Sequence, residues 1–97
     1  MPTGLKIQEA SDLEIKLKYK DTGSIAIAKC NNIKIEGNKN TQNNITIYNS
    51  KINYIDIPSV NNRVKILNSD INSTITSGNI EIENCNILNI VFNIYLF

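Results

Sequence analysis

The segments IAIAKC (residues 25–30) and ITIYNS (residues 45–50) share one pattern. Each begins with an apolar residue, places Ile two residues later, and ends with a polar residue and a small one. Working outward along the chain, three more copies of this hexad begin at Leu5, Val64 and Ile80. The five starts are 20, 20, 19 and 16 residues apart. Self-similarity at such a spacing is typical of a repeat in which each copy stacks on its neighbours.

Aligning the copies from their first residues extends the pattern into columns. The sixth place is always small: Ala10, Cys30, Ser50, Ser69 and Cys85. The eleventh place holds Ile15, Ile35, Ile55, Thr74 and Ile90, and the thirteenth holds Leu17, Gly37, Ile57, Thr76 and Phe92. We interpret the small column as a tight corner that points inward and the other two as a second inward-facing stack. The sequence therefore predicts an all-β fold, a short single-domain parallel β-helix, or β-solenoid, of about five coils within residues 1–97.

Apolar residues recur at alternate positions throughout, as β-strands require and helices do not. The strands that this alternation predicts are Leu5–Ile7, Leu13–Tyr19, Ile25–Ala28, Ile33–Ile35, Ile45–Tyr48, Ile52–Ile57, Val64–Leu67, Ile71–Thr76, Ile80–Glu83 and Ile87–Leu96. The alternative fold is an antiparallel β-sandwich or barrel. Residues 13–27 favour it, because two alternating segments flank the turn residues Asp21 and Gly23.

The corner is expected to change between the second and third copies. The next apolar residue stands at the ninth place in the first two copies, at Leu13 and Ile33, and at the eighth place in the later three. Those later copies also carry Asn at the fifth place: Asn49, Asn68 and Asn84. Stacked amides offer donors and acceptors to the coils above and below. We therefore expect an asparagine ladder along this corner.

Composition limits the classes of function. Ile occurs 19 times and Asn 17 times, which fits both an AT-rich genome and the needs of stacked β-coils. Ten basic and nine acidic residues give a net charge of +1, so neither nucleic acid nor an anionic membrane is expected as a partner. No secretory signal is recognisable at the N-terminus. The chain is expected to be soluble, with the virion or the cytoplasm as suitable locations.

The residues offer little for catalysis or for cofactors. The chain has no His and two Cys that are 55 positions apart, so neither a metal nor a cofactor is expected. Cys30 and Cys85 share a column but lie three coils apart, beyond the reach of a disulfide. Paired carboxylates remain as the catalytic option, with Asp56, Asp70, Glu81 and Glu83 as the candidates, and a carbohydrate-active fragment would use Asp56 or Glu81 and Glu83 for acid/base work. Solvated side chains on a strand explain Glu81 and Glu83 more simply. We expect no enzymatic activity.

The five hexads and the column of Asn49, Asn68 and Asn84 resemble the repeats of right-handed parallel β-helices, the pectin-lyase-like architecture. The resemblance lies in the style of the repeat and covers residues 5 to about 92. It implies stacked parallel coils. It carries no catalytic residue of such proteins onto this chain.

The C-terminal segment breaks the alternation. Residues 90–97 would form a strand that is apolar on both faces, and such a strand needs cover on both sides. It either caps its own coil stack or associates with another chain. The residues expected to self-associate are Ile90, Val91, Phe92, Ile94, Tyr95, Leu96 and Phe97.

Two functions follow from these observations. The first is a non-enzymatic structural or interaction module that forms homo-oligomers, such as a fibre, spike or surface component of a virus or an AT-rich organism. The alternative is a small monomeric adaptor or inhibitor that binds another protein through an exposed sheet face. In that case Tyr48 and Tyr54 are the candidate partner contacts.

Overall fold

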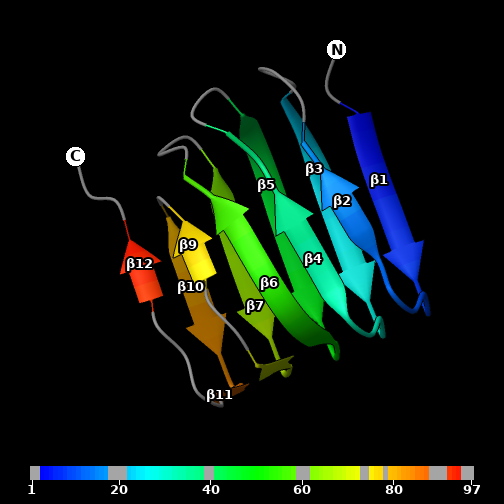
Figure 1. Ribbon diagram of the computed structural model, residues 1–97. Coiled ribbons are helices and arrows are strands. Elements are labelled where there is room, and N and C mark those ends of the chain that lie inside the picture. The colour runs from blue at the N-terminus through cyan, green and yellow to red at the C-terminus, as the bar shows by residue number, and fades with distance from the viewer. Residues whose placement is uncertain are drawn as a thin grey trace.

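The computed structural model describes residues 3–17, 22–38, 41–58, 62–72, 75–77, 79–87 and 92–94. Within these residues the chain is all-β and contains no helix, and its parallel strands form a β-solenoid of about four turns. Figure 1 shows the coils side by side, with β1 and β12 at opposite ends of the stack. The described residues accordingly contain no helix that could cross a membrane.

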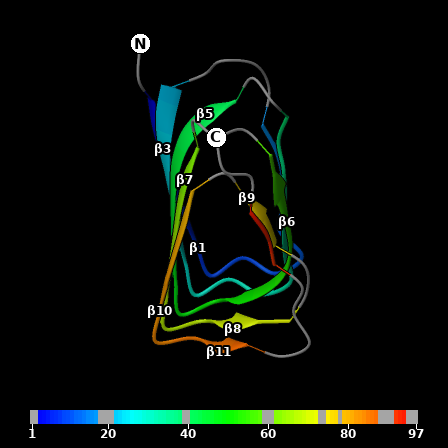
Figure 2. The same ribbon diagram turned by 90° about the vertical axis from the view of Figure 1, so that its left-hand side faces the viewer.

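Two sheets lie on opposite sides of the interior, and strands β8 (Asp70–Ile71) and β11 (Asn86–Ile87) of the second sheet run across a third side between them (Figure 2). The first contains, in spatial order, β1 (Thr3–Gln8), β3 (Thr22–Ala28), β5 (Gln42–Tyr48), β7 (Arg63–Leu67) and β10 (Ile80–Glu83). The second contains β2 (Glu14–Lys16), β4 (Ile33–Glu36), β6 (Lys51–Ile57), β8 (Asp70–Ile71), β9 (Ile75–Ser77), β11 (Asn86–Ile87) and β12 (Phe92–Ile94). Every pairing between these strands is parallel.

The register of the first sheet confirms the alignment of the hexads. Paired residues place the first column in the order Leu5, Ile25, Ile45, Val64 and Ile80. The third column follows as Ile7, Ile27, Ile47, Ile66 and Ile82. The opening residue of each hexad therefore lies beside the opening residue of the next, as the repeat predicts.

The core lies between the sheets and consists mainly of isoleucine. Its fully or almost fully buried members are Ile25, Ile27, Ile33, Ile35, Ile45, Ile47, Ile52, Ile55, Ile57, Ile66, Ile71, Ile75, Val64 and Cys30. A β-branched side chain suits a pleated surface because it packs against the same residue in the strands on either side. Each fully buried Ile contributes roughly 1.5–3 kcal/mol by leaving water. Stacked isoleucine columns thus hold the coils together.

The second sheet requires a correction in the last two coils. Ile35 and Ile55 share a column as predicted, but the next residue in it is Ile75, not Thr74. The thirteenth column likewise continues from Ile57 to Ser77, so Thr76 points outward. The paired residues Ile52 and Ile71 show the cause, because three residues separate Ile71 from Ile75 and only two separate Ile52 from Ile55. The extra residue shifts the pattern by one place and buries Ile in preference to Thr.

The fifth copy shifts further. Phe92 pairs with Ile75 and therefore occupies the eleventh column, where Ile90 was predicted, while Ile94 pairs with Ser77. Ile90 itself lies outside the described residues. The predicted strand Ile87–Leu96 is correspondingly divided into β11 and β12, as Ile71–Thr76 is divided into β8 and β9.

The antiparallel alternative is wrong. Residues 14–16 form β2, which pairs with β4 in parallel and has no pairing with β3. Of the predicted turn residues, Gly23 lies within β3 and Asp21 is outside the described residues, and β2 and β3 do not form a hairpin. Strands β3, β5 and β7 also begin earlier than the alternation alone indicates, because polar residues at their starts still pair with the neighbouring coil.

Buried polar side chains line the side of the interior at which the chain passes from the second sheet back to the first, between β4 and β5 and between β6 and β7. Thr41 and Asn62 are fully buried, and Asn62 Nδ2 donates to Thr41 Oγ1 at 2.9 Å. Asn62 Oδ1 accepts from the N–H of Asn43 at 2.8 Å, and the Thr41 hydroxyl donates to Asn38 O at 2.9 Å. Within the described residues, every buried side-chain nitrogen or oxygen has a partner. This cluster closes the interior with satisfied polar groups.

A substitution at Gly37 tests how tightly the interior is packed beside this cluster. A Cβ at Gly37 would lie 3.0 Å from Thr41 Oγ1 and 3.1 Å from Ile57 Cγ2. We expect Gly37→Val to lower the free energy of unfolding by about 1–3 kcal/mol through overpacking. Gly4→Ala is the control, because a Cβ there meets no atom within 4 Å. Chemical denaturation followed by circular dichroism measures both, and equal effects at the two positions would contradict this description of the interior.

Candidate functional site

A left-handed residue turns each coil out of the first sheet. The backbone φ lies between 49° and 57° at the fifth place of all five copies: Glu9, Lys29, Asn49, Asn68 and Asn84. Asn adopts this conformation more readily than most residues, which explains its use in the later coils. Glu and Lys adopt the same conformation in the first two coils. The fifth place therefore has one geometry throughout.

The predicted corner change lies three residues further on. Asp12 and Asn32 each add a second left-handed residue to the first two coils, with φ of 55° and 53°. The later coils lack this residue and reach Ile52 and Ile71 one place earlier. In the third coil an irregularity in the pairing of β4 with β6 compensates for the missing residue. Ile33 pairs with Ile52, but the next residue, Lys34, pairs with Tyr54, so Asn53 is passed over in the pairing.

The small column of the corner is a hydrogen-bond ladder. The Ser50 hydroxyl donates to Tyr48 O at 2.9 Å and accepts from the N–H of Cys30 at 3.1 Å. Ser69 repeats the arrangement with Leu67 O at 2.8 Å and the N–H of Ser50 at 3.1 Å. The Cys30 thiol takes the same place, 3.4 Å from both Ala28 O and the Ala10 nitrogen. Each side chain thus satisfies backbone groups of its own coil and of the coil before it.

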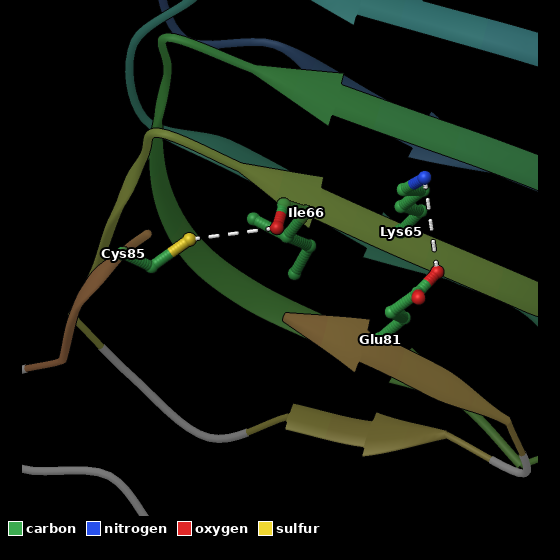
Figure 3. Close-up of polar contacts among 4 residues, drawn as sticks. All are labelled: Lys65, Ile66, Glu81 and Cys85. Atoms are coloured by element: carbon green, nitrogen blue, oxygen red, sulfur yellow. Dashed lines mark hydrogen bonds and ion pairs between the residues drawn. The ribbon is translucent and has the colours of Figure 1, made fainter. Parts of the chain in front are cut away.

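The cysteines belong to this ladder, and both are free thiols. The Cys85 sulfur, at the corner after β10, lies 3.5 Å from Ile66 O (Figure 3) and 3.3 Å from Glu83 O. Cys30 therefore acts as both donor and acceptor, as the serines of this column do, whereas Cys85 acts as a donor. The small size of these residues was predicted from the sequence, but their hydrogen bonding was not.

Asparagine side chains connect the coils on the outside of the corner. Asn84 Nδ2 donates to Asn68 Oδ1 at 2.7 Å, within the expected ladder of Asn49, Asn68 and Asn84. A second series was not foreseen: Asn53 donates to Asn32 Oδ1 at 2.5 Å, and Asn32 donates to Asp12 Oδ1 at 2.6 Å. The spacing of 20 and 21 residues between its members was its signal in the sequence.

The outer faces of the sheets are polar and carry charges of both signs. Lys65 Nζ lies 3.9 Å from Glu81 Oε2 on the neighbouring strand (Figure 3), and Lys16 lies 3.5 Å from Glu14 on its own strand. A hollow of about 640 Å³ on the outer face of the first sheet is lined by Asn44, Thr46, Arg63, Lys65, Asn79 and Glu81, among others. The exposed ion pairs Lys65–Glu81 and Lys16–Glu14 contribute at most about 1 kcal/mol each to the free energy of unfolding.

The candidate acidic residues are spread over this surface. Glu81 and Glu83 are exposed on β10, whereas Asp56 is on β6 in the other sheet. Among the described residues, no group of three or more Cys, Asp or Glu side chains is close enough to hold a metal ion.

The two candidate tyrosines lie on different sheets. Tyr48 is on the outer side of β5 and Tyr54 is on the outer side of β6, and both are half-buried. A partner that docked on one sheet face would therefore contact one tyrosine and not the other. The Tyr54 hydroxyl donates to Asp56 Oδ2 at 3.2 Å. Partial burial raises the pKa of Tyr54, and the negative charges of Asp56 and Glu36 raise it further.

The apolar surface is found at the two ends of the stack. In the first coil, Leu5 is 51% exposed, and Ile7, Leu13, Ile15 and Leu17 pack against the core on one side and are only partly buried. At the other end Ile80 and Ile82 are partly buried and Ile87 is 46% exposed. The isoleucines and Val64 of the same columns are buried in the middle coils, because there each residue has a coil above and below it.

The predicted self-association segment is only partly within the described residues. Phe92 and Ile94 belong to β12, whose backbone pairs in parallel with β9 of the same chain. Ile90, Val91, Tyr95, Leu96 and Phe97 lie outside the described residues. Apolar surface was predicted at this end alone. It is also present in the first coil, where no described strand pairs with the outer side of β1 or β2.

The corner ladder gives a testable prediction. Ser50→Ala removes the acceptor of the buried Cys30 N–H, so we expect the free energy of unfolding to fall by about 1–3 kcal/mol. Cys30→Ser, which keeps a donor and acceptor in the column, is expected to stay within about 1 kcal/mol of the parent protein. Ser11→Ala serves as the exposed control. If all three variants unfold at the same denaturant concentration, the ladder is not a source of stability.

Tyr54 gives a second prediction. Because its pKa is raised above the ordinary value of about 10, folding favours the neutral phenol, and this contribution is present below pH 10 and lost as pH rises through the folded-state pKa. We expect Asp56→Asn to lower the pKa of Tyr54. The difference in phenolate absorbance between each protein and its Tyr54→Phe counterpart isolates this tyrosine. Glu83→Gln is the control for charge, and an unchanged titration in Asp56→Asn would refute the coupling.

Comparisons with protein-family models, curated proteins and solved structures found no match to this chain.

Proposed function

We propose that this protein is a structural or interaction module that assembles with further copies of itself through the ends of its coil stack. The observation that carries the proposal is the incomplete burial of the isoleucine and leucine columns at both ends. Leu5 and Ile87 are the large apolar side chains with the greatest exposure among the described residues.

Contact with another coil would complete these columns. A side chain such as Leu5, about half exposed, would gain roughly 1 kcal/mol on full burial. The partly buried residues Ile7, Leu13, Ile15 and Leu17 would add to that gain. Strand edges support the same conclusion, because β1 has a paired neighbour on one side only and unpaired edges attract further strands.

The size of the chain also favours association. A domain of 97 residues buries about two-thirds of the surface that its unfolded chain exposes, and small domains often gain core by oligomerising. Here the interior is enclosed by a single stack of coils, so added copies would lengthen the core along the stack without changing its cross-section. The product would be stiff and elongated, as suits a fibre, a spike or a surface layer.

Solution mass tests the proposal. We expect the weight-average mass in sedimentation to rise above 10.9 kDa as the concentration increases. Leu5→Gln should shift the protein toward the monomer because it removes apolar surface from one end. Leu67→Gln, on the outer face of β7, is the matched control and should assemble like the parent protein.

A chain that ends at Asn89 tests the other end. It lacks β12, so we expect weaker association with the circular dichroism of the remaining coils retained. Monomers at every concentration, in both the full chain and the shortened one, would overturn the proposed function.

A further inference from the structure

We propose that the copies stack head to tail, so that the first coil of one copy continues the last coil of another with Lys6 beside Glu81. This inference rests on the proposed function and specifies how the copies meet. It follows from two series of backbone hydrogen bonds and one column of charged residues that run through the stack. Among the described residues, each series leaves a donor or an acceptor without a partner at the last coil, and the first coil carries the group that would match it.

The first series consists of N–H groups that donate to the following coil. The N–H at the fifth place bonds to the carbonyl at the fourth place of the next copy: Glu9 to Ala28, Lys29 to Tyr48, Asn49 to Leu67 and Asn68 to Glu83, at 3.0–3.2 Å. The next donor would be Asn84, and the described residues contain no acceptor for its N–H. Within the part of the chain that the structure describes, the N–H of Asn84 is therefore a donor without an acceptor.

The matching acceptor lies at the opposite end. The carbonyls that accept in this series all point toward the preceding coil: those of Ala28, Tyr48, Leu67 and Glu83. Gln8 occupies the same column in the first coil, where it pairs in register with Ala28. Its carbonyl therefore points away from β3, toward the side of β1 on which no described strand pairs with it. In a head-to-tail stack the N–H of Asn84 would donate to Gln8 O of the next copy.

The second series runs in the reverse direction. The N–H at the seventh place bonds to the carbonyl at the sixth place of the preceding copy: Asn31 to Ala10, Lys51 to Cys30, Asp70 to Ser50 and Asn86 to Ser69, at 2.9–3.0 Å. Cys85 O is the next acceptor, and no described residue donates to it. Ser11, the residue at the seventh place of the first coil, supplies the missing donor in the same head-to-tail arrangement.

The outward charges agree with this register. Lys6, Ala26, Thr46, Lys65 and Glu81 form one column on the outer face of the first sheet. Glu81 lies beside Lys65 within the chain (Figure 3), and no described strand pairs with β10 on the side away from β7. A further coil at the usual strand spacing of about 4.8 Å would place Lys6 of the next copy on that side. Glu81 would then lie between two lysines.

Strand direction and charge both disfavour the other arrangements. All pairings within the chain are parallel, and only head-to-tail contact repeats them. Contact between two last coils would reverse the strands and bring Glu81 and Glu83 of both copies together, where like charges repel. Because the two contacting surfaces differ and the contact is a continuation of the coil, the assembly is open and grows into a filament.

Cross-linking between two single-cysteine proteins tests the inference. Both carry Cys30→Ser and Cys85→Ser, since serine already occupies this column at Ser50 and Ser69. One then carries Gln8→Cys and the other Glu83→Cys, two positions that share a column in the proposed contact. Neighbouring residues of adjacent strands lie within disulfide reach. We expect a disulfide-linked heterodimer after mild oxidation of the mixture, and little homodimer from either protein alone.

A second mixture controls for register. Asn79→Cys replaces Glu83→Cys and lies four residues earlier at the same edge, about 13 Å along the strand direction. This substitution keeps both Lys6 and Glu81. We expect at least tenfold less heterodimer with Gln8→Cys than the in-register pair gives.

The outcomes separate this inference from the proposed function. Homodimers of the Gln8→Cys protein alone, or of the Glu83→Cys protein alone, would establish a head-to-head or tail-to-tail contact and overturn the inference while association stands. Association in sedimentation without any of these cross-links would also overturn the inference, because the register would be wrong. A monomer in sedimentation at all concentrations would overturn both.

Discussion

Each coil turns at a residue whose backbone is left-handed, and the rest of the structure depends on that turn. The fifth-place φ values cluster within a few degrees from Glu9 to Asn84 although the side chains differ. This geometry directs the next residue inward, so only a small side chain fits at the sixth place. It also brings that side chain within hydrogen-bonding distance of the corner backbone. Serine and cysteine then satisfy backbone groups that would otherwise be buried without a partner.

The first sheet could be predicted from the sequence because its repeat is regular. Apolar residues at the first and third places of each hexad are enough to set the register from Leu5 to Ile82, and the structure confirms it. Alternation has a period of two, so the register is strongly determined wherever one face is buried. The fifth place was also recognised as a special position, although the reason given was asparagine stacking and not backbone conformation.

The second sheet could be predicted only in part, because the connecting segments vary in length. A single additional residue between Ile71 and Ile75 moves the inward column from Thr74 to Ile75, and no local signal marks where that residue is accommodated. Stacking decides the matter, since burying isoleucine in the column of Ile55 is more favourable than burying threonine. The hydrogen bonds of the small column escaped prediction for another reason. A small residue at a corner is explained equally well by packing, and the sequence does not distinguish packing from bonding.

A final consequence concerns how the chain folds. Every coil touches only the coil before it and the coil after it, as the strand order of each sheet shows. The stability of such an array is approximately the sum of the coils and of their nearest-neighbour interfaces. The three middle coils, from β3 to β9, have described neighbours on both sides and contain all the buried isoleucines of the core. The coils of β1 and β10 each pair with a described coil on one side. Folding is therefore expected to nucleate in the middle of the chain and to spread toward both termini. Thermal opening would proceed in the reverse order, with the outer coils exchanging their amide hydrogens long before the centre.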